Sequence, residues 1–197
     1  MTELAAISDF IRELDKLKAV KRQVRIPEDG DRQENSAEHS WHVALMATSL
    51  SRFAGDDVDI ARVVQMILIH DLVEIDAGDM FAFASDAHHD EQEAREQAAA
   101  DRIFGLLPSP LNTELRQMWQ EFEDAETPDA RFAKAMDRVL PVFQNMKANG
   151  GSWARHGISR SQILKRNAYL ELSAPALWHY VIEQTDIAVA RGYLKDA

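Results

Sequence analysis

Cysteine is absent from this chain of 197 residues. Its absence excludes disulfide scaffolds, thiolate zinc sites, iron–sulfur clusters and cysteine nucleophiles, and it fits a reducing cytosol. Glycine and proline are sparse, which excludes collagen-like and low-complexity chains. No apolar run approaches the roughly 20 residues of a membrane span, and the N-terminal stretch has no signal-peptide pattern. We therefore expect a cytoplasmic protein that does not act in a membrane.

Positive charge is also scarce. The chain has 22 lysines and arginines against 33 acidic residues, for a net charge of −11. Proteins that bind nucleic acid through its phosphates normally show the opposite balance, so we expect no nucleic-acid polymer as a partner. Basic residues cluster near the start of the chain and create a local positive field that suits a small phosphorylated molecule. A solvated helix face would give the same pattern. The residues that create this field are Lys16, Lys18, Lys21, Arg22, Arg25 and Arg32.

Apolar residues recur at helical spacing along most of the chain, and no strand alternation of useful length is present. Helix-start signals accompany the spacing: N-cap residues at Thr2, Ser36, Asp57 and Thr127, and a capping box formed by Ser159 and Gln162. Proline 141 lies inside the longest pattern and predicts a kink. The predicted helices cover residues 2–20, 36–54, 58–75, 90–107, 113–125 and 127–147, with a short helix after residue 159 and a last one over about 173–192.

Two segments break this helical pattern. Residues 21–35 are polar, and residues 76–89 are expected to form a loop. The length fits one domain over residues 1–197. The predicted fold class is therefore all-α, a compact helical domain of about seven to nine helices.

Ionisable residues occupy places where the predicted helices should be apolar. Asp137 flanks an apolar stripe, and a buried lone carboxylate needs a partner or a metal ion. In the helix over 58–75, the aliphatic face gives way within one turn to His70, Asp71 and Glu74. The ordinary explanations are a buried salt bridge for Asp137 and a helix that leaves the core for residues 70–74.

Two histidines at the start of another predicted helix share one face. His39 and His42 are three residues apart, a common arrangement of metal ligands, although a lone histidine is more often a structural hydrogen-bonding group. Imidazole and carboxylate groups are the only good ligands that this chain offers. The plausible ions are therefore Mn, Co, Fe, Ni, Zn or Mg.

The order of these residues resembles a known family. His39, the pair His70-Asp71 and the later Asp137 match the H…HD…D signature of the HD-domain superfamily of metal-dependent phosphohydrolases. The segment HDLVEIDAGD over residues 70–79 strengthens the resemblance. Within the superfamily, the chain is most similar to small bacterial proteins related to 5′-deoxynucleotidases. The resemblance runs over about residues 14–145, and the tail beyond is expected to add little about function.

The resemblance implies a site and a reaction. One divalent cation would be held by His39, His70, Asp71 and Asp137. A water activated by the metal would release the 5′-phosphate of a nucleoside or deoxynucleoside monophosphate. The resemblance also implies a homodimer.

The family resemblance further implies roles for four other residues. Glu74 would be the acid/base catalyst, Asp79 would contact the sugar, and Arg22 would orient the phosphate. Gln23 stands where the family has a tryptophan against the sugar. We therefore expect only modest discrimination between deoxyribose and ribose.

Other functions remain open from the sequence. The same site could hydrolyse a dNTP, an alarmone, a cyclic dinucleotide or another small phosphoester, or it could be a structural metal site in an interaction module. Glu74 favours chemistry, because a structural site needs no extra carboxylate. His88 and His89 are adjacent in the expected loop, whereas two-metal HD sites draw such histidines from separate positions. A single metal ion is therefore expected.

Overall fold

The computed structural model describes residues 2–83 and 86–197, and it confirms the all-α class. Within that part of the chain, eight helices have eight or more residues, which agrees with the expected seven to nine. They are α1 (Glu3–Glu13), α2 (Ser36–Ser49), α3 (Ile60–His70), α5 (Asp86–Phe104), α6 (Leu111–Asp124), α7 (Pro128–Lys147), α9 (Arg160–Asn167) and α11 (Pro175–Ala190). Shorter helices are α4 (Glu74–Ala77), α8 (Gly151–His156) and α10 (Leu170–Ser173).

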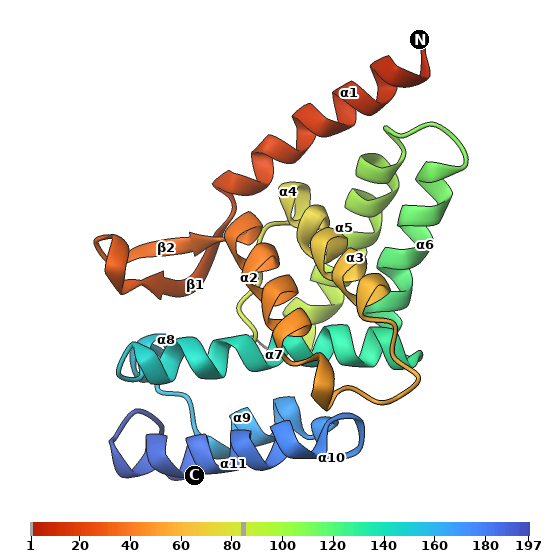
Figure 1. Cartoon of the computed structure of the whole chain (residues 1–197). Helices are drawn as coiled ribbons and strands as arrows, with labels where there is room; N and C mark the ends of the chain where they lie inside the picture. The colour runs from red at the N-terminus through yellow and green to blue at the C-terminus, as the bar shows by residue number, and fades with distance from the viewer. Residues whose placement is uncertain (1, 84–85) are drawn as a thin grey trace.

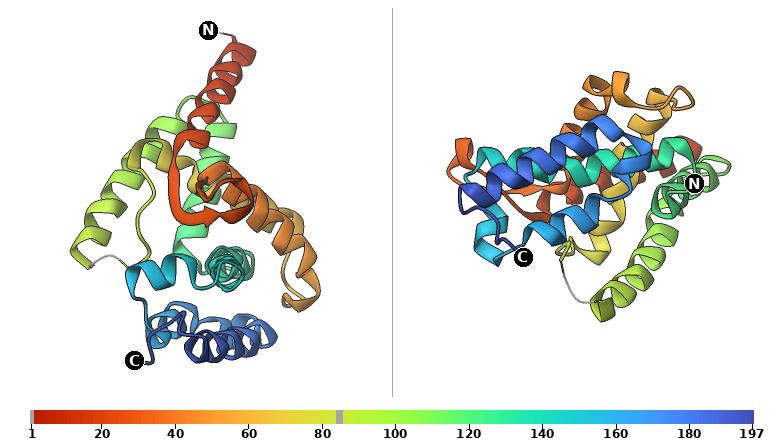
Figure 2. Two further views of the ribbon diagram at one scale, coloured as in Figure 1. Left: turned by 90° about the vertical axis from the view of Figure 1, so that its left-hand side faces the viewer. Right: turned by 90° about the horizontal axis from the view of Figure 1, so that it is seen from below.

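Helix α7 crosses the middle of the molecule, between two groups of helices (Figure 1). Helices α2, α3 and α6 pack on one side of it, and α9, α10 and α11 pack on the other. The left view of Figure 2 shows the C-terminal helices as a separate layer beneath α7. Phe132, Met136 and Leu140 of α7 are almost completely buried in the larger apolar core. No helix in the described ranges is both long and apolar enough to cross a bilayer.

A small hairpin corrects the prediction that the chain has no strands. Strand β1 (Lys21–Ile26) pairs antiparallel with β2 (Arg32–Asn35). Gly30 adopts the left-handed conformation, with φ of 62°, in the turn that joins them. Most hairpin side chains are polar and only half-buried, so the apolar alternation that reveals a strand is missing.

Several predicted helix boundaries were also wrong. The first helix ends at Glu13 and continues as a 3₁₀ segment over Leu14–Ala19. Asn35 rather than Ser36 caps α2, and Asp59 rather than Asp57 caps α3, because these side chains accept the free backbone N–H groups. Helix α5 begins inside the expected 76–89 loop, α8 was not predicted, and α11 starts at Pro175. The Thr2 and Thr127 caps and the Ser159–Gln162 capping box are confirmed.

Candidate active site

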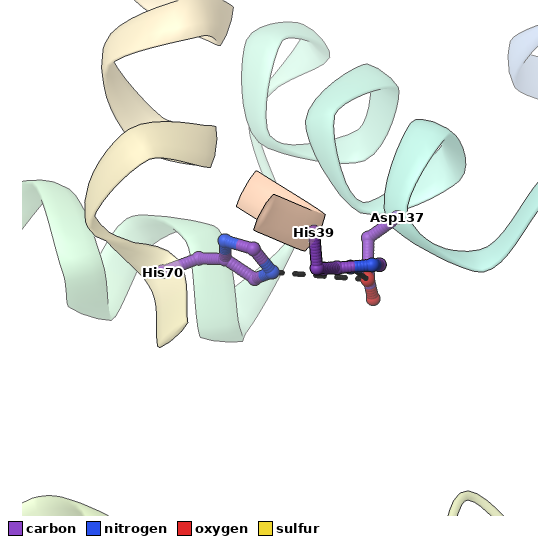
Figure 3. A group of neighbouring side chains, drawn as sticks. All are labelled: His39, His70 and Asp137. Atoms are coloured by element: carbon purple, nitrogen blue, oxygen red, sulfur yellow. Dashed lines mark hydrogen bonds and ion pairs between the residues drawn. The ribbon is translucent and has the colours of Figure 1, made fainter. Parts of the chain in front are cut away.

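Side chains from three helices converge beside α7. His39 of α2, His70 of α3 and Asp137 of α7 each offer one ligand atom, and these atoms lie within 4.8 Å of one another (Figure 3). Asp137 Oδ1 is 2.8 Å from His39 Nε2 and 3.7 Å from His70 Nε2. Both histidines are buried, with 0% and 4% of their surface exposed. A metal-free cluster of this kind is costly unless something binds the facing lone pairs.

Local structure fixes the two histidines. Asn35 and Glu38 form a capping box that starts α2 immediately before His39. Helix α3 ends at His70, where a 3₁₀ turn over Asp71–Val73 replaces the continuous helix predicted for residues 58–75. The indole Nε1 of Trp119 donates to the His70 carbonyl oxygen at 3.1 Å. The helix end that carries the His70-Asp71 pair is thus anchored from α6.

The histidine nitrogens are arranged as a cation would require. Nδ1 of His70 lies 2.6 Å from the Ile67 carbonyl oxygen, so this nitrogen carries the proton and Nε2 presents a lone pair. Nε2 lies 2.9 Å from Asp71 Oδ1, but the contact lacks hydrogen-bond geometry. Nδ1 of His39 faces Glu34 Oε2 at 3.3 Å, also without a hydrogen bond. The orphaned Nε2 of His70 fits a bound metal ion, whereas Nδ1 of His39 faces Glu34 and leaves Nε2 as the ligand atom of that ring.

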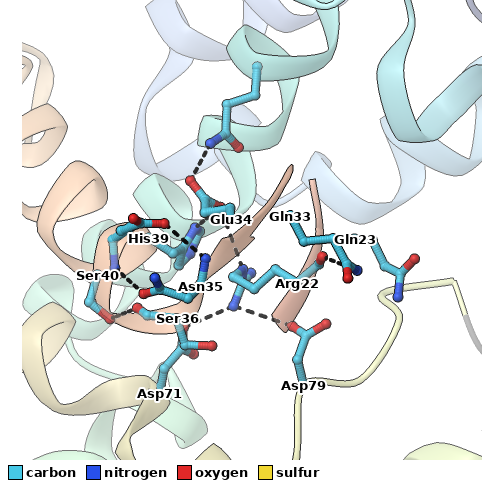
Figure 4. Close-up of polar contacts among 12 residues, drawn as sticks. Arg22, Gln23, Gln33, Glu34, Asn35, Ser36, His39, Ser40, Asp71 and Asp79 are labelled. Atoms are coloured by element: carbon cyan, nitrogen blue, oxygen red, sulfur yellow. Dashed lines mark hydrogen bonds and ion pairs between the residues drawn. The ribbon is translucent and has the colours of Figure 1, made fainter. Parts of the chain in front are cut away.

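The sequence predicted Asp71 as the fourth ligand; it lies beside His70 but is not a member of the His39, His70 and Asp137 group. Its Oδ2 accepts a hydrogen bond from Arg22 Nη1 at 2.9 Å (Figure 4). Arg22 Nη1 is also 3.4 Å from Asp79 and 3.7 Å from Glu74. Burial acts to lower the pKa of Arg22, but the neighbouring carboxylates, Asp71 first, outweigh it and raise the pKa. Arg22 therefore stays charged, and much of its charge is already neutralised.

Two carboxyl groups next to this cluster differ from ordinary acids. Burial, reinforced by the charge of Asp71, raises the pKa of Glu74 well above its usual range. Ser36 Oγ donates to Glu74 Oε2 at 2.5 Å. Burial likewise raises the pKa of Asp79 to about 6, against the opposing effect of Arg22. The raised pKa makes Glu74 easier to protonate than an ordinary glutamate, which suits a general acid.

Sequence reasoning missed a buried acid that orients a ligand. Glu34 is only 3% exposed, faces His39 through Oε2, and accepts from Gln144 Nε2 at 2.6 Å through Oε1. A carboxylate behind a histidine fixes its tautomer and ring orientation in many metal sites. Glu34 lies in a polar strand with no motif around it. The sequence therefore gave no signal for this role.

The other residues that the sequence singled out lie in different places. His42 is exposed and does not belong to the ligand group. His88 lies on the exposed surface of α5, and the side chain of His89 is outside the described residues. Gln23 lines a cavity with Arg22 and Asp79, and its carbonyl oxygen accepts from Arg155 at 2.7 Å.

The tail beyond residue 145 contributes to this cavity, contrary to expectation. Trp153 of α8 and Ile163, Arg166 and Asn167 of α9 line it together with Asp137. The prediction was wrong because these residues form no motif along the sequence. Only the packing of α8 and α9 against α7 brings them to the site.

A buried His/His/Asp group among helices, next to an arginine and an acid with a raised pKa, is typical of hydrolytic metal centres. Comparison with known proteins makes the class specific. Residues 14–178 match the family model described as HD domain, so the chain belongs to the HD-domain family.

Relatives with names and structures share this fold. The human protein named 5′-deoxynucleotidase HDDC2 is 30% identical over 139 residues, which cover 71% of this chain and 66% of that protein. This chain thus spans just under two thirds of the human relative. A 5′-deoxynucleotidase of Erwinia tasmaniensis is 28% identical over 74% of this chain and 77% of its own length.

One solved structure has a higher sequence identity to this chain than these two relatives. A crystal structure described as a predicted metal-dependent phosphohydrolase from Magnetospirillum magnetotacticum is 47% identical, with a TM-score of 0.90 over 98% of each chain. An HD-domain phosphohydrolase from Listeria innocua has a TM-score of 0.62 at 15% identity, covering 92% of this chain and 94% of that one. The second comparison supports the fold alone.

Proposed function

We propose that this protein is a metal-dependent phosphohydrolase that removes the 5′-phosphate from nucleoside or deoxynucleoside monophosphates. The observation that carries the proposal is the buried His39, His70 and Asp137 group with Glu74 beside it. A structural metal site needs no proton donor next to its ligands, whereas hydrolysis of an ester is accelerated by one placed at the leaving group. The names of the relatives support a nucleotide substrate.

One divalent ion would be held by His39, His70, Asp71 and Asp137. Nitrogen and oxygen ligands of this kind suit Mn, Co, Fe, Ni, Zn or Mg. When bound, such an ion supplies Lewis acidity to a phosphoryl oxygen and lowers the pKa of water. Glu34 and the Ile67 carbonyl oxygen hold the two imidazoles in the orientation that ligation needs.

The remaining residues would handle the substrate. Arg22 orients the phosphate through Nη2, because its hydrogen bond to a carboxylate of the described residues is made by Nη1. Glu74 donates its proton to the leaving O5′ as the bond to phosphorus breaks. Asp79 and Gln23 line the same cavity as Arg22, where the sugar would lie.

A phosphate-release screen tests this function. The purified protein is stripped with a chelator, then supplied with each of the six ions and a panel of nucleoside monophosphates. We expect phosphate release that depends on the added ion. A parallel panel of a dNTP, an alarmone and a cyclic dinucleotide is followed by chromatography, because hydrolysis of these esters need not free inorganic phosphate. Turnover of one of them instead of a monophosphate would change the substrate, and no turnover in either panel would favour the interaction module.

Location and assembly belong to the same proposal. A cytoplasmic site of action is supported by a chain without cysteine. A homodimer is supported by the exposed apolar side chains of Trp41 and Leu45 on α2 and Leu68 on α3. Light scattering of the purified protein checks the second point, and a monomer at micromolar concentration would contradict it.

A further inference from the structure

Two arginines outside the recognised motif face the candidate site. Arg138 of α7 and Arg166 of α9 line the cavity that contains Arg22, Asp79 and Asp137. Both also line a neighbouring cavity that reaches His70, Asp71 and Glu74. The two side chains therefore border both spaces through which a substrate could approach the ligand group.

Neither arginine has an acidic partner in the described part of the chain, unlike Arg22. Arg138 Nη1 donates to the Arg166 carbonyl oxygen at 3.2 Å, and its guanidinium lies 4.8 Å from the centre of the Tyr169 ring. Arg166 Nη1 reaches only the Ala82 carbonyl oxygen, at 3.5 Å. Burial lowers the pKa of Arg166, and the charge of Arg138 adds to this effect against the attraction of Asp137. Two neighbouring cations are thus held partly out of water, with no ion pair to a carboxylate of the described residues.

The charge of the rest of the site explains why extra cations are needed. Arg22 alone faces a group of carboxylates. A phosphate monoester is close to a dianion at neutral pH, so these groups would repel it. Even a divalent ion leaves the site short of positive charge. The carboxylates in question are Glu34, Asp71, Asp79 and Asp137.

We propose that Arg138 and Arg166 form an anion subsite that holds the phosphate group of the substrate, with Arg22 completing it. The chemical class of ligand is a phosphate monoester or free phosphate ion. Arginine suits this task because its planar fork of donors matches phosphate oxygens. The identity of the ester rests on the proposed function, whereas anion binding by this pair does not.

Substitution of each arginine by methionine tests the subsite. Arg166→Met and Arg138→Met keep a long apolar stem and remove the charge. Lys165→Met is the matched control, because it makes the same charge change at an exposed position of the same helix. The probe is inorganic phosphate, titrated calorimetrically into each protein with Mg²⁺ present. We expect Arg166→Met to weaken phosphate binding about tenfold or more, with Lys165→Met unchanged.

Kinetics separate this proposal from the function itself. If the parent hydrolyses a nucleotide, Arg166→Met should raise KM about tenfold or more while the bound metal content stays constant. If the parent hydrolyses nothing, the phosphate titration still decides the subsite. Parent-like phosphate binding in both methionine variants would overturn the proposal, as would equal weakening by Lys165→Met. Should Arg166→Met fail to fold, Arg166→Lys takes its place, with weaker phosphate binding expected because the fork is lost.

Discussion

One side of the site is acidic and tightly paired, whereas the other is cationic and apolar. The first side, built by β2, α2, α3, α4 and α7, holds His39, His70 and Asp137 with their neighbouring carboxylates. The second side adds Trp153, Ile163 and Arg166 from α8 and α9. Groups that act together on one atom must keep fixed spacings, and this requirement produces a sequence motif. A binding surface needs only suitable shape and charge, which different residues can supply.

This difference implies that substitutions on the two sides should have different effects. Changes on the acidic side should remove the metal or the chemistry, because its residues depend on one another within a few ångströms. Changes on the cationic side should mainly alter substrate binding.

Asp137→Ala should abolish metal binding and activity together. Asp137 Oδ1 is the atom shared by both histidines. Its removal also leaves His39 buried with an unsatisfied nitrogen, which costs about 1–3 kcal/mol of unfolding free energy. Metal analysis, phosphate release and urea unfolding measure the three losses. Asp56→Ala, at an exposed position, is the control, and a full metal complement in Asp137→Ala would refute the ligand assignment.

Glu74→Gln should separate chemistry from metal binding. Glutamine keeps the size and the contact with Ser36 but cannot transfer a proton. The rate should fall by at least about 10²-fold, while metal content and melting temperature stay close to those of the parent. The exposed Glu91→Gln serves as the control. A parent-like rate would mean that the acid lies elsewhere and that the acidic side does less chemistry than its geometry indicates.

Much of the acidic side was predictable because its signals are local. Thr127 and Pro128 mark the start of α7, and the apolar stripe of that helix sets Asp137 against the core. The pair His70-Asp71 follows an aliphatic helical face. These patterns repeat every three to four residues and can be recognised without knowing the tertiary fold.

The rest depends on contacts between residues distant in the sequence. Glu34 reaches His39 from a polar hairpin, and Gln144 approaches Glu34 from 110 residues away. Arg166 follows an ordinary capping box in a polar helix, and nothing nearby marks it as a residue facing a cavity. The 3₁₀ turn after His70 was missed because its residues continue the helical spacing.

The cationic and apolar cavity should distinguish sugars only weakly. Gln23 lines it, at the position where the family resemblance implies a tryptophan against the sugar, and its amide can bond either to a hydroxyl or to water. We expect the ratio of kcat/KM between 2′-deoxy and ribo monophosphates of one base to stay below roughly a hundredfold. Gln23→Trp should increase this ratio. A tryptophan at Gln33 would not serve as the control, because the Gln33 side chain donates to the Arg22 carbonyl oxygen and its loss would disturb Arg22. A larger ratio in the parent would assign sugar recognition to another residue, with Asp79 the first candidate.

The smallest expected effect concerns the stability cost of the acidic side. Burial raises the pKa of Asp79 to about 6 in the folded protein, whereas an unfolded chain has a value of about 3.9. A raised carboxyl pKa means that the charged form is less stable in the folded state, so Asp79 destabilises the fold at pH 7. This penalty shrinks as the pH falls through 6 and is absent below about 4. Asp79→Asn removes the charge but keeps a buried amide, so the metal-free variant should be more stable by about 1 kcal/mol at pH 7 and by less at pH 5. Urea unfolding at both pH values in the presence of a chelator measures the difference. A variant that is less stable than the parent at pH 7 would show that the ion pair with Arg22 outweighs burial, and that the acidic side is stabilised by its own pairing before any metal ion binds.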